Sequence, residues 1–118
     1  MAKIMVVDDA AFMRMKCAKL LAENGYEVLE AETGAQAVEK YQSDKPDGVL
    51  LDITMPDMDG LAALKEMKRI NPDARVAMVT AMGQQRIVME ALKSGASDFV
   101  VKPFDAARVL SAVKKLLG

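Results

Sequence analysis

Five side chains suited to phosphoryl chemistry stand at the ends of short apolar runs in this sequence. Asp8 and Asp9 follow the first run, Asp52 the third, Thr80 the fourth and Lys102 the fifth. A carboxylate can act as a nucleophile, and a lysine can neutralise charge on the oxygens of a transferring phosphoryl group. If the fold brings these groups together, they have the parts needed to accept or move a phosphoryl group.

The three carboxylates would also require a counterion. At about 5 Å and an effective dielectric constant of about 20, each carboxylate pair repels by roughly 3 kcal/mol, which the single ammonium of Lys102 cannot offset. A divalent cation can offset it. Ligands that are all oxygen, at a site left open to water, suit Mg²⁺ or Mn²⁺ better than zinc. The acids therefore predict a Mg²⁺ site, with Mn²⁺ as an alternative.

The apolar runs are spaced like the strands of an alternating β/α protein. They cover residues 3–7, 27–31, 48–51, 75–79 and 98–101. The gaps hold segments of about 10–14 residues with helical periodicity, and most runs are apolar throughout, as in parallel strands covered on both faces. We predict an α/β fold, a doubly wound five-stranded parallel sheet with helices on both faces. In such sheets ligands bind beyond the carboxyl ends of the strands, where the five polar side chains stand.

Local signals place the helices between these strands. Thr33 and Asp105 are predicted to cap the second and fifth helices. Asp59 or Gly60 would open the third helix, and the fourth is expected at about residues 84–94. The predicted buried stripe of the first helix consists of Met13, Cys17, Leu20 and Leu21.

Composition narrows the function further. The 118 residues fit one domain, predicted to span residues 1–118, and 16 basic against 17 acidic residues give a net charge of −1. This balance gives no bulk attraction for nucleic acid or for a membrane surface.

The absence of histidine excludes histidine-based catalysis, and a single cysteine, Cys17, excludes an internal disulfide. No apolar run approaches the roughly 20 residues that span a bilayer, and we expect a monomeric, cytoplasmic protein.

Several short motifs occur together in a specific order. They are Val-Val-Asp-Asp at 6–9, Leu-Asp-Ile-Thr-Met-Pro at 51–56, Asp-Gly at 59–60, Thr-Ala at 80–81, Gly-Ala at 95–96 and Val-Lys-Pro-Phe at 101–104. With these motifs the whole chain resembles response-regulator receiver domains, most closely the free-standing, CheY-like chemotaxis regulators. The resemblance implies a flavodoxin-like strand order of 2-1-3-4-5. It also implies a signalling domain rather than an enzyme, although such a domain can promote its own phosphorylation and dephosphorylation.

The resemblance assigns a role to each site residue. Asp52 would be the phospho-acceptor, taking a phosphoryl group from the phosphohistidine of a partner histidine kinase. Mg²⁺ would be bound by the carboxylates of Asp9 and Asp52, by the backbone carbonyl of Thr54, and by Asp8 largely through water. Lys102 would pair with a phosphoryl oxygen.

The resemblance also implies a switch. Thr80 would hydrogen-bond the phosphoryl group and shift when Asp52 is modified, and Phe99 would turn inward into the space that Thr80 leaves. The bond between Lys102 and Pro103 is expected to be cis.

An apolar strip on the fourth helix is the candidate partner surface. Val88 and Leu92 are four residues apart and are predicted to form an exposed strip beside Phe99, although the alternative that these side chains are core remains open. The resemblance implies a flagellar motor switch protein, or another effector, as the partner of this face. We therefore expect a two-component switch that controls chemotaxis and flagellar rotation.

Three alternatives remain. The chain could be a receiver of another two-component or phosphorelay pathway, or a scaffold that binds partners without phosphorylation, although Asp52, Thr80 and Lys102 argue against a scaffold. A small Mg²⁺-dependent aspartyl phosphatase would also use an aspartate nucleophile. Such enzymes typically place a second aspartate two residues later as general acid, and this chain has Thr54 there.

Overall fold

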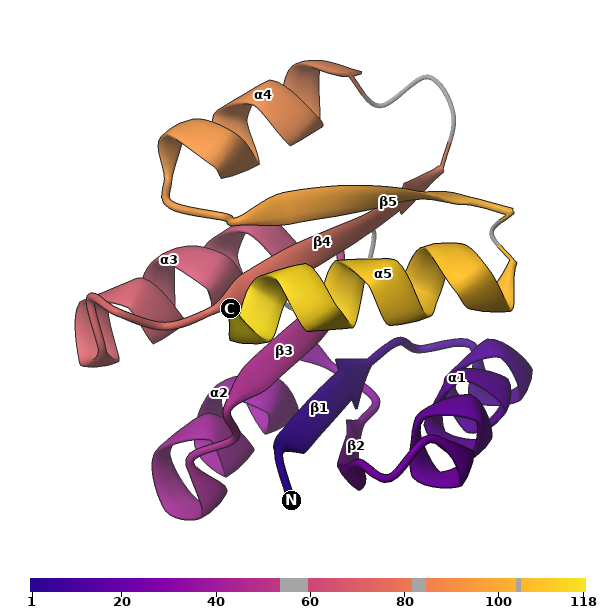
Figure 1. Ribbon diagram of the computed structural model, residues 1–118. Helices are drawn as coiled ribbons and strands as arrows, with labels where there is room; N and C mark the ends of the chain where they lie inside the picture. The colour runs from indigo at the N-terminus through magenta and orange to yellow at the C-terminus, as the bar shows by residue number, and fades with distance from the viewer. Residues whose placement is uncertain (54–59, 82–84, 104) are drawn as a thin grey trace.

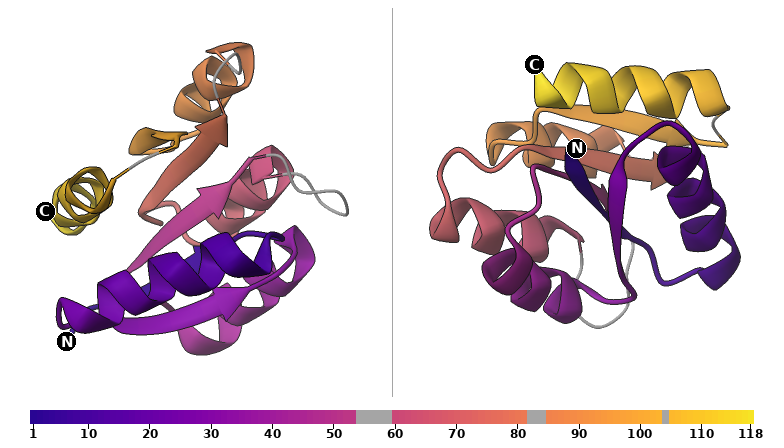
Figure 2. Two further views of the ribbon diagram at one scale, coloured as in Figure 1. Left: turned by 90° about the vertical axis from the view of Figure 1, so that its right-hand side faces the viewer. Right: turned by 60° about the horizontal axis from the view of Figure 1, so that its bottom comes forward.

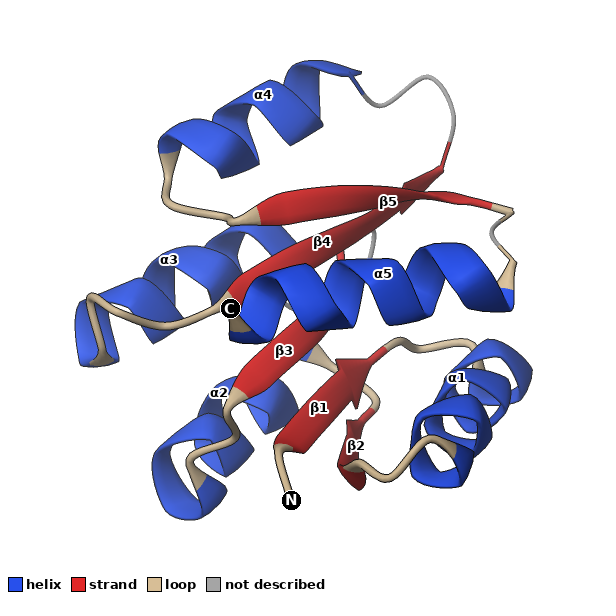
Figure 3. Cartoon of the chain, viewed as in Figure 1, coloured by secondary structure: helices blue, strands red, loops and turns tan. Residues whose placement is uncertain are grey.

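The computed structural model describes residues 1–53, 60–81, 85–103 and 105–118, in which five strands alternate with five helices (Figures 1 and 3). The strands are β1 (Lys3–Val7), β2 (Glu27–Ala31), β3 (Gly48–Asp52), β4 (Val76–Ala81) and β5 (Asp98–Lys102). The helices are α1 (Ala11–Glu23), α2 (Gly34–Asp44), α3 (Gly60–Ile70), α4 (Gln85–Lys93) and α5 (Ala106–Leu117). Within the described residues, no helix has both the length and the apolar character needed to cross a bilayer.

The strands form one parallel sheet in the order β2-β1-β3-β4-β5, which confirms the predicted α/β architecture and strand order. The order reverses at β1, which lies between β2 and β3. All five carboxyl ends therefore meet at one edge of the sheet, and the crevice beside the reversal point is where ligands bind in such folds.

Helices cover both faces of the sheet, as the uninterrupted apolar strands predicted (Figures 1 and 2). Successive residues of a strand point to opposite faces. In β1, Met5 and Val7 pack in a core cluster with residues of α2, α3 and α4. Ile4 and Val6 pack in a second cluster with residues of α1 and α5. The result is three layers with the sheet in the middle.

The predicted helix caps are present. The Thr33 hydroxyl accepts from the Gln36 amide at 3.1 Å, and the Asp105 carboxylate accepts from the Arg108 amide at 2.9 Å. The fourth helix begins at Gln85, inside the predicted range of 84–94. Strand β4 runs to Ala81 rather than ending at residue 79, because its last residues pair with β5.

The buried stripe of α1 differs from the prediction. Its buried residues are Arg14, Cys17 and Leu21, whereas Met13 and Leu20 are only partly buried. Cys17 and Leu21 are buried as predicted, and Leu20 packs against the core cluster that α1 shares with α5. The prediction differs at position 14, because it did not include Arg14, which helical periodicity places on the same face as Cys17 and Leu21.

Candidate functional site

Three carboxylates gather at the carboxyl edge of the sheet. Asp8 follows β1, Asp52 ends β3, and one carboxylate oxygen of each, with one of Asp9, all lie within 4.8 Å of one another. Asp8 is 6% exposed and Asp52 3% exposed, whereas Asp9 is exposed. The structure thus brings together the three acids that the sequence predicted to meet. Their oxygen-only donor set, with one member facing solvent, fits Mg²⁺.

Lys102 joins this acidic cluster from the end of β5. Its Nζ lies 3.0 Å from Asp8 Oδ2 and 3.3 Å from Asp52 Oδ2, so one ammonium bridges two carboxylates. Burial by itself would lower the pKa of Lys102. The hydrogen bond to Asp8 and the charges of Asp52 and Asp8 outweigh burial, and the pKa lies above its ordinary value of 10.5. Three carboxylates and one ammonium leave two net negative charges, which a divalent cation would neutralise.

Backbone hydrogen bonds fix the two loops that carry the acids. The Asp8 amide donates to the Ala31 carbonyl at 3.1 Å, and Asp8 Oδ1 accepts from the Ala10 amide at 2.9 Å. After β3, the Ile53 amide donates to the Val79 carbonyl at 3.2 Å. Both acidic segments are therefore held against neighbouring strands, which keeps the like-charged groups close together.

A glycine permits the close packing behind Asp52. Gly60 opens α3, and a Cβ added there would lie 2.3 Å from the Asp52 carbonyl oxygen and 2.4 Å from Ile53 Cα. Both atoms belong to the backbone, so they could not move aside without shifting the end of β3. Glycine at position 60 therefore allows α3 to begin directly against the strand end that presents Asp52.

Thr80 and Phe99 lie near the site on β4 and β5. Thr80 is 1% exposed, its hydroxyl donates to the Ala81 carbonyl at 3.1 Å, and it follows Val79, the register partner of Asp52. Phe99 is half-buried, pairs in register with Met78 and packs against the core cluster under α2, α3 and α4. Strand β4 therefore links Asp52, which pairs with Val79, to Phe99, which pairs with Met78. The movement of Thr80 and Phe99 stays a prediction.

The structure corrects one residue of the predicted apolar strip. Val88 is 8% exposed and belongs to the core cluster, because it is on the face of α4 that packs against the sheet. Leu92 is 38% exposed, and Met89 is 57% exposed on the same helix. The exposed apolar surface of α4 therefore consists of Met89 and Leu92, with Val88 beneath it.

Two further predictions concern the loops after β3 and β5. The peptide bond between Lys102 and Pro103 is cis, as predicted. Thr54, the predicted carbonyl ligand of the metal, lies outside the described residues. Asp59, which was considered as the start of the third helix, lies outside them as well.

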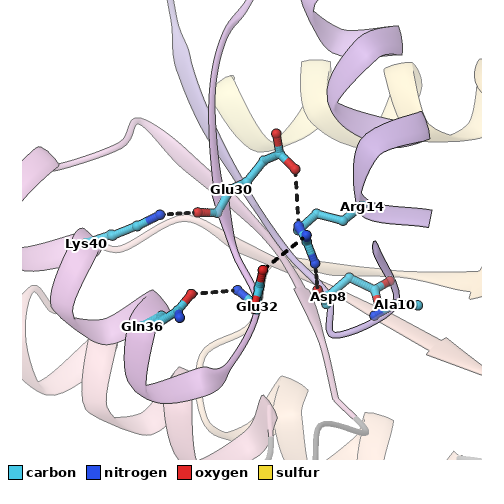
Figure 4. Close-up of polar contacts among 7 residues, drawn as sticks. All are labelled: Asp8, Ala10, Arg14, Glu30, Glu32, Gln36 and Lys40. Atoms are coloured by element: carbon cyan, nitrogen blue, oxygen red, sulfur yellow. Dashed lines mark hydrogen bonds and ion pairs between the residues drawn. The ribbon is translucent and has the colours of Figure 1, made fainter. Parts of the chain in front are cut away.

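Sequence reasoning missed Arg14, whose guanidinium reaches the site from α1 (Figure 4). Arg14 Nη1 donates to the Asp8 carbonyl at 2.9 Å, and the same side chain contacts Glu30 and Glu32. One signal could have revealed this role. Helical periodicity places Arg14 on the same face as Cys17, three residues later, so a cation was to be expected among buried side chains.

Comparisons with known proteins agree with this geometry. Residues 4–114 match the response regulator receiver domain family. The chain is 59% identical over 117 residues to the chemotaxis protein CheY of Bacillus subtilis (strain 168), covering 98% of both chains.

Two solved structures superpose closely on the chain. A response regulator receiver domain protein from Clostridium thermocellum gives a TM-score of 0.95 at 29% identity, covering 99% of this chain and 94% of the other. CheY in the CheX-CheY-BeF3-Mg²⁺ complex from Borrelia burgdorferi gives 0.93 at 35% identity, covering 99% and 90%. The chain therefore belongs to the response regulator receiver domain family, whose members are signalling domains.

Proposed function

We propose that this chain is a Mg²⁺-dependent phosphorylation switch in which Asp52 accepts a phosphoryl group from a histidine kinase to control chemotaxis. The observation that carries the proposal is the cluster of three carboxylates with oxygens within 4.8 Å, two of them bridged by Lys102. A structural ion pair needs only one acid for its lysine. The third, exposed acid adds repulsion that a cation bound there would offset.

The chemistry follows from the charges of the site. A carboxylate oxygen of Asp52 attacks phosphorus, the P–N bond of the donor phosphohistidine breaks, and its electron pair stays on the donor imidazole. The chain has no histidine, so the donor belongs to a partner. Lys102 is protonated at neutral pH, since even its ordinary pKa of 10.5 is far above 7 and the neighbouring acids raise it further, and its ammonium can pair with a phosphoryl oxygen. When bound, Mg²⁺ supplies the positive charge that the site lacks.

Asp8, Asp9 and Asp52 would hold the metal, with the carbonyl of Thr54 as a further ligand. A structurally similar chain from Borrelia burgdorferi was crystallised in a CheX-CheY-BeF3-Mg²⁺ complex, which supports magnesium as the cation in this chain. In this chain Asp8 already accepts hydrogen bonds from Lys102 and the Ala10 amide. Asp8 would therefore act through water, and Asp9, the exposed acid, would be the most available direct ligand.

Phosphorylation would be read through Thr80 and Phe99. A phosphoryl group adds charge and strong acceptor oxygens beside β4, which favours a conformation in which the Thr80 hydroxyl turns from the Ala81 carbonyl toward it. Phe99 is half-buried beside Met78, two residues before Thr80, so its ring could become more buried when Thr80 moves. The switch is then a shift between two packings of the same core.

The output surface would be the face of α4 and β5. Leu92 and Phe99 would contact the partner, with Val88 supporting them from the core. Because the curated relative at 59% identity is a chemotaxis protein, the partner we propose is the flagellar motor switch protein. Another effector of a two-component pathway is the alternative.

The proposal is tested by intact-mass measurement after incubation with acetyl phosphate. We expect one added phosphoryl group on the wild type with Mg²⁺, none with EDTA, and none on Asp52→Asn with Mg²⁺. An Asp52→Asn variant that gains the same mass would show that another residue is the acceptor. Steady turnover of p-nitrophenyl phosphate without an adduct would favour the phosphatase.

A further inference from the structure

Arg14 is the one buried polar or charged residue of the described chain that the proposed function leaves without a role. The others are Asp8, Asp52 and Thr80, all of which lie in the candidate site. Arg14 is 9% exposed, and removing a guanidinium from water costs several kcal/mol unless its donors are bonded. Its bonds therefore indicate what the fold gains by burying it.

The guanidinium joins three segments of the chain (Figure 4). Nη1 donates to the Asp8 carbonyl at 2.9 Å, Nε donates to Glu30 Oε1 at 3.1 Å, and Nη2 lies 3.5 Å from Glu32 Oε1. Glu30 is on β2 and Glu32 follows it. The Lys40 ammonium donates to the Glu30 carbonyl, and the Gln36 side-chain oxygen accepts from the Glu32 amide. The edge of the sheet thus anchors the arginine that holds the Asp8 carbonyl.

The bonded carbonyl belongs to the peptide group that connects Asp8 to Asp9. This group is planar, so fixing its oxygen limits the rotation that sets the direction of the next residue. The Asp8 amide is fixed as well, through the Ala31 carbonyl, and the Asp8 carboxylate is held by Lys102. Asp9 is exposed, so its placement depends on the backbone that precedes it.

The two glutamates also matter electrostatically. A lone guanidinium beside the acids would repel a dication. Glu30 and Glu32 place two negative charges on the outer side of Arg14 and offset its charge. Arg14 can therefore hold the carbonyl without opposing a cation at the site.

We propose that Arg14 is a positioning residue for magnesium, holding the Asp8–Asp9 peptide group so that the Asp9 carboxylate faces the metal. The inference rests on the proposed function, because it requires that the acidic cluster binds Mg²⁺. Removal of a residue that orients a metal ligand typically weakens metal affinity by 10–100-fold.

The test is calorimetric titration of the apo proteins with Mg²⁺. Arg14→Met is expected to bind Mg²⁺ about tenfold more weakly than wild type, and Arg14→Lys about threefold more weakly, since an ammonium cannot hold the carbonyl and both glutamates together. Arg75→Met is the matched control, because Arg75 also donates to a backbone carbonyl, that of Leu117, outside the site. Its affinity should equal that of wild type.

A double-mutant cycle separates positioning from general destabilisation. If Arg14 acts through Asp9, Arg14→Met should weaken Mg²⁺ binding much less in an Asp9→Asn background than in the wild type. With acetyl phosphate, Arg14→Met should raise the Mg²⁺ concentration for half-maximal phosphorylation and leave the rate at saturating Mg²⁺ nearly unchanged.

The outcomes distinguish this inference from the function beneath it. Wild-type affinity in folded Arg14→Met overturns the inference and leaves the function intact, as does an equal loss in both backgrounds of the cycle. If Arg14→Met does not fold, wild-type affinity in Arg14→Lys overturns it. A wild type that binds no Mg²⁺ overturns the proposed function and this inference together.

Discussion

Removing the Asp9 carboxylate should stabilise the metal-free protein. Asp9→Asn keeps the size of the side chain and deletes one charge from a cluster whose oxygens lie within 4.8 Å. The other two acids share Lys102, at 3.0 and 3.3 Å, so the substitution leaves both ion pairs in place. Asp8→Asn would instead remove the ion pair between Asp8 and Lys102, and the Asp8 side chain is buried.

The expected size follows from Coulomb's law. At about 5 Å, one carboxylate pair repels by roughly 1 kcal/mol in a water-like dielectric and roughly 3 kcal/mol at a dielectric constant of 20. Asp9 forms two such pairs, but it is exposed and feels the attraction of Lys102 as well. We therefore expect a net gain of about 1–2 kcal/mol, which corresponds to about 3–8 °C in Tm for a chain of this size.

The assay is thermal unfolding followed by circular dichroism in EDTA at low and moderate ionic strength. Asp9→Asn should melt above wild type, more so at low salt, where screening is weak. Asp8→Asn should gain less than Asp9→Asn or melt below wild type. With saturating Mg²⁺ the wild type should gain more stability than Asp9→Asn does, because only the wild type keeps all the ligands. Equal or lower Tm of Asp9→Asn in EDTA would refute the reasoning that the acids are crowded.

Further predictions concern three residues, Gly60, Cys17 and Lys102. Gly60→Ala should lower the free energy of unfolding in urea by about 1–3 kcal/mol and slow phosphorylation, since its Cβ would lie 2.3 Å from the Asp52 carbonyl oxygen; wild-type values for both would contradict the packing. Burial, with a smaller effect of Asp8, raises the pKa of the Cys17 thiol to about 11, so Cys17 should react with a disulfide reagent at pH 8 far more slowly than in urea. Ionisation of this thiol in the unfolded chain should lower the stability of wild type relative to Cys17→Ala as pH rises through 9 toward 11, with little change below about pH 8. The pKa of Lys102 is raised, so the stability that it adds relative to Lys102→Met should be constant at neutral pH and decline only as pH rises above 10.5; a decline near pH 8 would show that the ammonium is not held by the acids.

The fold was predictable because the hydrophobic pattern, the helix caps and the spacing of the segments all indicated the same alternation of strands and helices. Apolar runs at regular spacing required buried parallel strands, and cap residues such as Thr33 marked helix starts. The acids and Lys102 were predictable as a site because the carboxyl ends of parallel strands share one edge. Strand ends were less predictable, since the length of β4 depends on its pairing with β5.

Burial on individual helix faces was harder to predict. Periodicity marks a face of a helix but does not say which residue at its border is covered, so Val88 was expected at the surface and is in the core. Arg14 was missed for a related reason. Its burial is offset by Glu30 on β2 and by Glu32 just after it, partners 16 and 18 residues away that only the tertiary structure brings together.

The central claim, that Asp52 is the phospho-acceptor, is tested most directly by locating the phosphoryl group. The wild type is incubated with acetyl phosphate and Mg²⁺, reduced with borohydride, which converts an aspartyl phosphate to homoserine, and then sequenced by tandem mass spectrometry. We expect the reduced residue at position 52 alone, and none when EDTA replaces Mg²⁺. Reduction at Asp8 or Asp9, or none at all in a sample that had gained phosphoryl mass, would contradict the account.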